Sequence, residues 1–270
     1  MTKTKIFLTV AVLLVLVSVF GAWTGGYDTE IRYAQATPIS TQASETINYT
    51  SIVEEGFTTT AGGCPMYYPI SDLTNACGAI AGAEIVAFYD KYYENLVPNW
   101  VSYYTSSGKY RIQDGTNVPA IMREMYTLMR TNVDDVGVSR TDCLNGLQSY
   151  INNHGYKVNY ESVTTTGNKL NYEKCKNAID NNKVIILFTT PTTVYDIGIS
   201  TNRHIISSTN ITGAHIMVVC GYYKVSYYNN SKLIRTDTYV SAVLGWDGMS
   251  MSFYKIDSTT TQAAYIVNIQ

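Results

Sequence analysis

Five cysteines and three histidines are the residues of this 270-residue chain most suited to covalent chemistry. No two of the cysteines are separated by only two residues, so the spacing of a zinc knuckle or a thioredoxin-like site is missing from the sequence. An odd number of cysteines in an exported chain leaves at least one thiol without an intramolecular partner. Such a thiol beside a general base is a nucleophile for acyl transfer. The five are Cys64, Cys77, Cys143, Cys175 and Cys220.

Cys77 has the position that best suits a nucleophile. The sequence Asn75-Ala76-Cys77-Gly78 leads into the apolar segment 77–93, which predicts a buried helix starting at this cysteine. Free backbone N–H groups and the helix dipole favour an anion there, so we expect a thiol pKa below the usual value. The same N–H groups are suited to holding an oxyanion. A small buried apolar residue is the alternative role for Cys77.

His215 is the most suitable base. It follows Gly213 and Ala214 at the start of the apolar segment 215–223, and these small neighbours leave its ring open on one side. The other two histidines lie in a helix-ending turn (His154) and in a polar loop (His204). A nucleophilic cysteine on an early helix and a histidine on a late strand can meet across two halves of one fold.

The remaining cysteines suit structural roles. Cys175 and Cys220 fall on apolar faces, and we expect both to be buried and unreactive. Cys64 and Cys143 lie near the ends of predicted elements, and in an exported chain they form the expected disulfide pair.

Hydrophobic periodicity predicts helices first and antiparallel strands later, which is an α+β order. A turn at Asn229-Asn230 joins two of the strands. The expected domain covers residues 61–270, and the Thr- and Ser-rich residues 23–60 before it are expected to be a linker or short pro-segment. The predicted helices are 77–93, 118–130, 141–153 and 170–181, and the predicted strands are 183–189, 215–223, 232–244 and 253–256.

The N-terminus resembles a secretory signal peptide, expected over residues 1–22. Lys3 and Lys5 precede an apolar run of 15 residues, Ile6–Phe20, and small residues follow. The alternative is an uncleaved anchor, but a spanning helix needs about 20 apolar residues. We therefore expect a secreted or cell-surface protein with no stable membrane insertion after signal cleavage.

Composition excludes two broad classes of protein. Hydrophobic residues make up 46% of the chain, which is enough for a large core and excludes global disorder. The net charge of −2 disfavours a protein that follows nucleic-acid phosphates, so no nucleic-acid partner is expected. Neither a metal-binding cluster nor a glycine-rich phosphate loop occurs in the sequence, so no metal or cofactor is expected.

Three motifs together are similar to those of the papain-like cysteine peptidases, in particular the secreted bacterial branch with streptopain-like and bacteriocin-leader-processing enzymes. They are Asn75-x-Cys77-Gly78 before a small-residue helix, Gly213-x-His215 before a hydrophobic strand, and the late sequence 245–248, Gly-Trp-Asp-Gly. The resemblance covers roughly residues 60–270. It implies an N-terminal helical half, with the central Cys77 helix packed on a C-terminal antiparallel sheet.

The resemblance also implies roles for individual residues. Cys77 would attack a peptide carbonyl and His215 would transfer the proton, with a protein or peptide as substrate. Asp247 would orient the imidazole, because the leader-processing branch uses an aspartate after the strand that follows the histidine. The asparagine that the streptopain-like branch has before the Gly-Trp turn is absent, since this chain has Val243-Leu244 there. A turn residue is the alternative role for Asp247. Asn75 would help to form the oxyanion hole, and Trp246 and Gly213 would border the substrate groove.

A secreted binding module without catalytic activity, on the same scaffold, is the alternative function. Two departures from the family favour it: Ser71 stands where the family has a glutamine before the cysteine, and the streptopain-type asparagine before the Gly-Trp turn is absent. The two functions differ in geometry, because an enzyme needs the cysteine sulfur within about 3–4 Å of an imidazole nitrogen in an open groove.

Overall fold

The computed structural model describes most of the chain after its first 29 residues. Two compact units are distinguished, Met1–Ile31 and Arg32–Gln270, and every helix and strand of the described residues lies in the second. The expected signal peptide lies outside the described residues. No helix in the described part of the chain is long and apolar enough to cross a bilayer. The described residues are 30–34, 36, 38–59, 63–98, 102–105, 108–111, 117–133, 136–246 and 251–270.

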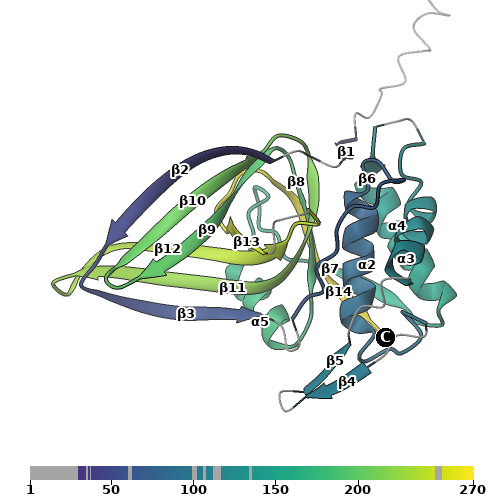
Figure 1. The fold of residues 1–270 in the computed structure, drawn as a ribbon, viewed down its shortest axis with the longest axis horizontal. Helices are drawn as coiled ribbons and strands as arrows, with labels where there is room; N and C mark the ends of the chain where they lie inside the picture. The colour runs from purple at the N-terminus through teal and green to yellow at the C-terminus, as the bar shows by residue number, and fades with distance from the viewer. Residues whose placement is uncertain are drawn as a thin grey trace, which may run out of the picture. The chain divides into compact units, whose positions relative to one another are not determined.

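An antiparallel sheet dominates the second unit (Figure 1). Within the described residues it has ten strands, in the order β2-β10-β9-β13-β12-β11-β8-β14-β7, with β3 paired to β11. Two small two-stranded sheets, β1-β6 and β4-β5, accompany it. The strands of the large sheet are β2 (Pro38–Asn48), β3 (Ser51–Thr59), β7 (Val158–Ser162), β8 (Ile185–Thr189), β9 (Thr192–Ser200), β10 (Arg203–Ile211), β11 (His215–Asn229), β12 (Lys232–Val243), β13 (Ser252–Lys255) and β14 (Thr261–Ile269). The short strands are β1 (Arg32–Tyr33), β6 (Val138–Ser139), β4 (Ser102–Thr105) and β5 (Gly108–Arg111).

Four helices are described: α2 (Cys77–Tyr89), α3 (Asn117–Leu128), α4 (Arg140–Asn153) and α5 (Tyr172–Asp180). Every residue of α2 is buried, and all but Glu84 are small, apolar or aromatic; the Glu84 carboxyl accepts the Tyr67 N–H at 3.2 Å. Two of the other helices begin with a side-chain cap. Ser139 accepts a hydrogen bond from the Asp142 N–H at the start of α4, and Asn171 accepts one from the Lys174 N–H at the start of α5.

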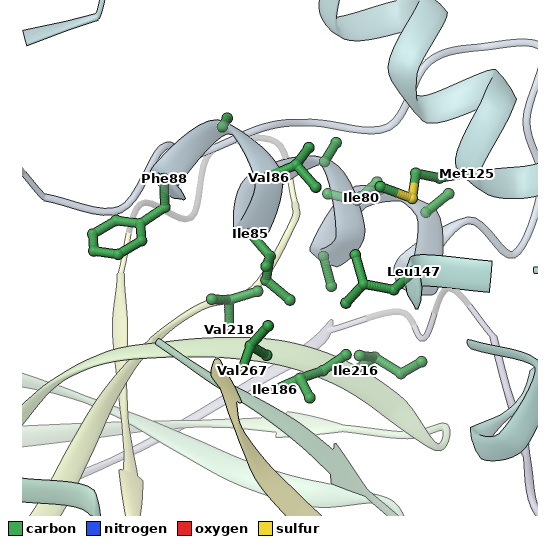
Figure 2. Packing of buried hydrophobic residues seen from close by; sticks show 14 of the residues in the cluster. Ile80, Ile85, Val86, Phe88, Met125, Leu147, Ile186, Ile216, Val218 and Val267 are labelled. Atoms are coloured by element: carbon green, nitrogen blue, oxygen red, sulfur yellow. The ribbon is translucent and has the colours of Figure 1, made fainter. Parts of the chain in front are cut away.

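The strand β11 connects two hydrophobic cores, because successive side chains of a strand point to opposite faces. Ile216 and Val218 belong to the core that contains α2, whereas Met217 and Val219 belong to the core that contains residues of α5. Figure 2 shows Ile85 of α2 pointing toward the sheet residues Val218 and Val267. The helix that begins at Cys77 is thereby held against the strand that begins at His215.

The expectation of an α+β papain-like fold with an N-terminal helical half is wrong, because antiparallel sheet predominates. Much of the difference comes from segments without apolar periodicity. Residues 38–59, part of the expected linker or pro-segment, form the long strands β2 and β3, which pair with β10 and β11. Residues 192–211, which include the expected polar loop around His204, form the hairpin β9-β10. The Thr-rich composition of these segments suits strands once a partner strand is present.

Candidate active site around Cys77 and His215

Cys77 begins α2 and lies against the first residues of β11. Its side chain is buried, and the residue is 2% exposed. The backbone N–H of Ile216 is directed at the thiol, as are the N–H groups of Gly78 and of Cys77 itself. The thiol of the proposed nucleophile therefore contacts the residue that directly follows His215.

The pKa of Cys77 is raised to about 12, mainly because burial disfavours the thiolate, while the surrounding backbone N–H groups act in the opposite direction. The sequence-based expectation of a lowered pKa is therefore wrong for this closed arrangement. Three N–H dipoles do not replace the hydration that the thiolate loses on burial.

His215 is fully buried between a backbone carbonyl and an aromatic ring. Its Nε2 lies 2.8 Å from the carbonyl oxygen of Leu244, and the Trp246 ring stacks on the imidazole at 4.3 Å between centroids and 18° between planes. Because a carbonyl oxygen only accepts, this contact places a proton on Nε2. Nδ1 then presents its lone pair, and no donor within the described residues bonds to it, although the backbone of Ala34 lies near the ring.

Burial lowers the pKa of His215 to about 4, and the backbones of Leu244 and Ala34 act in the opposite direction. Near neutral pH both groups are therefore uncharged: Cys77 is a thiol and His215 an imidazole. The structure brings the Cys77 thiol to the backbone of Ile216, the residue after His215, but no hydrogen bond joins the thiol to Nδ1. Catalytic hydrogen bonds are often long or poorly aligned without substrate, so the missing bond does not remove the pair from consideration.

The other site residues expected from the sequence have mixed outcomes. Trp246 is buried and shields the imidazole by stacking on it. Asn75 uses its amide for support, since Nδ2 donates to Asn132 Oδ1 at 2.9 Å, and that oxygen also accepts the Gly137 N–H at 2.8 Å. The structure therefore gives no support to an oxyanion role for the Asn75 side chain. Asp247 lies outside the described residues.

Leu244 has a role that sequence reasoning missed. Its backbone carbonyl holds the histidine nitrogen that a catalytic asparagine or aspartate would hold. The only signal in the sequence is its position before the Gly245-Trp246 turn. A carbonyl oxygen belongs to every residue, so the residue type does not reveal this contact.

All five cysteines are free and buried. The expected disulfide between Cys64 and Cys143 is therefore wrong. The Cys64 thiol instead interacts with that of Cys220, and this contact together with burial raises the pKa of Cys64 well above its usual value. The expected burial of Cys175 and Cys220 is confirmed, since each is 0% exposed.

The site is closed by the chain itself. The Ala34 N–H donates to the Ala214 carbonyl at 3.2 Å, which places residue 34 beside the start of β11. Two hollows lie elsewhere: one of about 510 Å³ is lined by residues of β9, of β10 and of the segment 255–260, and one of about 620 Å³ lies near the ends of α2, α5 and β14. Neither hollow is lined by Cys77 or His215.

Comparison with known proteins gives no match. No family model fits the chain, and no curated protein or solved structure is similar to it. A function for this chain must therefore be inferred from its site alone.

Proposed function

We propose that this chain is an exported cysteine-type peptidase in which Cys77 is the nucleophile and His215 the general base. The observation that supports the proposal most strongly is the state of the imidazole. The Leu244 carbonyl fixes the proton on Nε2, and the buried Nδ1 is left without a donor. A buried nitrogen without a partner costs about 1–3 kcal/mol. His204 Nε2 is in the same state, so what distinguishes His215 is its place directly before Ile216, whose N–H is directed at the Cys77 thiol.

The arrangement of these groups supports hydrolysis of a peptide bond through an acyl-enzyme intermediate. The thiol proton passes to Nδ1 of His215 while the Cys77 sulfur forms a bond to the substrate carbonyl carbon. The C–N bond then breaks, and the departing amine takes the proton from Nδ1. Water next attacks the thioester and gives its proton to Nδ1. The C–S bond breaks, the carboxylic acid leaves, and the proton returns to the sulfur.

The backbone supplies the charge stabilisation that these reaction steps need. The N–H groups of Cys77 and Gly78 at the start of α2 lie at the thiol, where the oxyanion would develop. The Leu244 carbonyl stabilises the imidazolium formed during proton transfer. Because burial keeps both groups neutral, activity requires that the site open to water or to a substrate.

The first test is hydrolysis of casein by the exported, full-length chain. Cys77→Ser and His215→Gln are expected to lower kcat/KM by at least about 10³-fold, because nucleophile and base carry the bond-making steps. The matched control is Cys143→Ser, a substitution of another fully buried cysteine of the same core. It is expected to leave most activity. Full activity in Cys77→Ser would exclude the proposed nucleophile.

A binding module without catalysis is the second candidate. The missing thiol–imidazole hydrogen bond and the two neutral groups favour it. A measurement of peptide turnover distinguishes the two functions. A binding module would retain a peptide without cleaving it, and Cys77→Ser would bind that peptide as well as the unaltered chain.

A further inference from the structure

Two cysteine thiols meet in the core that packs α2 against the sheet. Cys64 lies in the segment before α2 and Cys220 lies in β11, and both belong to the same hydrophobic core. The two thiols are hydrogen-bonded to each other. Both residues are buried, at 8% and 0% exposed. The fold therefore brings together two sulfur atoms whose residues are 156 positions apart in the sequence.

The backbone of β11 directs Cys220 to this contact. Successive side chains of a strand point to opposite faces, so Ile216, Val218 and Cys220 share the face that contributes to the core of α2. The pairing of β11 with β12 shifts register between Val219 and Gly221, which makes Cys220 the extra residue of a β-bulge. Bulges re-aim side chains and are defined features of a strand, so the position of this thiol is set by the fold.

A second pair of cysteines lies in the same core without such a contact between thiols. A Cβ on Gly78, the residue after Cys77, would lie 3.5 Å from the Cys143 sulfur. Burial, and then the nearby Cys77 thiol, raise the pKa of Cys143. The Cys77 thiol has its hydrogen-bond contacts with backbone N–H groups. Cys175 belongs to the other core.

We propose that Cys64 and Cys220 form a disulfide bond when the chain folds in an oxidising environment, and that this bond ties the segment before α2 to β11. One cysteine, as its thiolate, attacks a low-molecular-weight disulfide, forms a mixed disulfide and releases a first small thiol. The other cysteine attacks the protein sulfur of the mixed disulfide, and a second small thiol leaves. The two cysteines lose two electrons and two protons, and the low-molecular-weight disulfide is reduced to two thiols.

Burial determines when this bond forms. The contact with Cys220, burial and the nearby Glu84 carboxyl all raise the pKa of Cys64. Since the thiolate is the attacking species, exchange is slow in the folded chain and proceeds while the core is still open to water. The same burial protects the finished bond from reductants.

This inference goes beyond the proposed function and does not require it. Cys77 takes no part in the bond, so failure to hydrolyse casein would leave the disulfide standing. Conversely, casein hydrolysis through Cys77 by a chain without the disulfide would leave the proposed function standing. The proposed export supplies the oxidising environment in the organism, and a glutathione buffer supplies it in the experiment.

The pairing is tested by refolding the full-length chain from its reduced, denatured state in a buffer of reduced and oxidised glutathione. Remaining thiols are blocked with iodoacetamide under denaturing conditions, and the unreduced digest is mapped by mass spectrometry. The expected product links Cys64 to Cys220, with Cys77, Cys143 and Cys175 blocked. Five blocked cysteines, or a link from Cys64 or Cys220 to a different cysteine, would overturn the proposal.

Stability provides a second measurement. A bond that closes so long a loop restricts the unfolded chain, so the oxidised chain should have a urea midpoint about 1 M or more above that of the reduced chain. Cys143→Ala, which removes another buried cysteine of the same core, should keep this difference. Cys64→Ala should abolish it, and the peptide map of the unaltered chain decides the pairing if that variant folds poorly. Equal midpoints for the oxidised and reduced unaltered chain, or a difference that survives in Cys64→Ala, would contradict the proposed bond.

Discussion

His215 shows how a neutral backbone group can orient a buried imidazole ring. A carboxylate at Nε2 would stabilise the imidazolium and raise the pKa of the histidine. The Leu244 carbonyl fixes the same tautomer without a full charge, and burial then keeps the pKa at about 4. Because the carbonyl does this, the Leu244 side chain is free to pack in the core beside Trp246.

This arrangement predicts a small effect of Asp247→Ala on kcat/KM. Since Nε2 is already held by the Leu244 carbonyl, we expect activity on casein to fall by less than about 10-fold, whereas a true third catalytic residue is worth about 10⁴-fold. Leu244→Ala, which keeps the carbonyl, serves as the control. A loss of about 10³-fold or more in Asp247→Ala, close to what a triad member contributes, would assign the orienting role to Asp247.

At the scale of elements, the strand β11 determines where the site lies. It begins at His215, shifts register with β12 between Val219 and Gly221, and ends in the hairpin turn before β12. Asn229 pairs with Lys232, so the turn has two residues, Asn230 and Ser231, which both have positive φ values of 47° and 64°. This backbone corresponds to a type I′ turn, in which Gly is preferred at the second position.

Replacing Ser231 by glycine should therefore stabilise the fold. The left-handed conformation is unfavourable for serine, and relief of that cost outweighs the greater freedom of glycine in the unfolded chain, by about 0.5–1 kcal/mol. Urea denaturation would show a higher midpoint for Ser231→Gly. Ser226→Gly, within β11, should lower the midpoint instead, because glycine weakens a strand interior. A lower midpoint in Ser231→Gly would contradict this interpretation of the turn.

At the scale of the whole molecule, the closed site couples stability to acid. The pKa of His215 is 6.5 when unperturbed and about 4 in the folded chain, so the unfolded chain binds this proton first as the pH falls. The free energy of unfolding should therefore decrease between pH 6.5 and pH 4, by roughly 3 kcal/mol at about 1.4 kcal/mol per pKa unit. Above pH 6.5 this contribution is fully present.

Denaturation by urea at a series of pH values measures this dependence. In His215→Gln the acid slope should flatten, because no proton is taken up at this position on unfolding. His154→Gln, at the end of α4, should keep the slope. Equal slopes in the unaltered chain and His215→Gln would show that the buried imidazole is not responsible.

The local hydrophobic pattern of the sequence was sufficient to predict the helices and to place Cys77 and His215 at the starts of their elements. The predicted helix 77–93 corresponds to α2 at Cys77–Tyr89, and the predicted segment 215–223 lies within β11. Both are strongly apolar, so burial and local preference agree. The same agreement located Cys77 at a helix start and His215 at a strand start.

Tertiary structure alone decided the remaining features. The strands β2 and β3 depend on hydrogen bonds to β10 and β11, which lie far away in the sequence. The Thr- and Ser-rich residues of β2 and β3 themselves show no hydrophobic periodicity that would predict a strand. The raised pKa of Cys77 depends on how completely the folded chain excludes water from the thiol. The orienting group at His215 and the contact of Ala34 with Ala214 act through backbone atoms, which are the same for every residue type. Residue identity therefore determined which groups can react, and chain packing determined which of them meet and in what charge state.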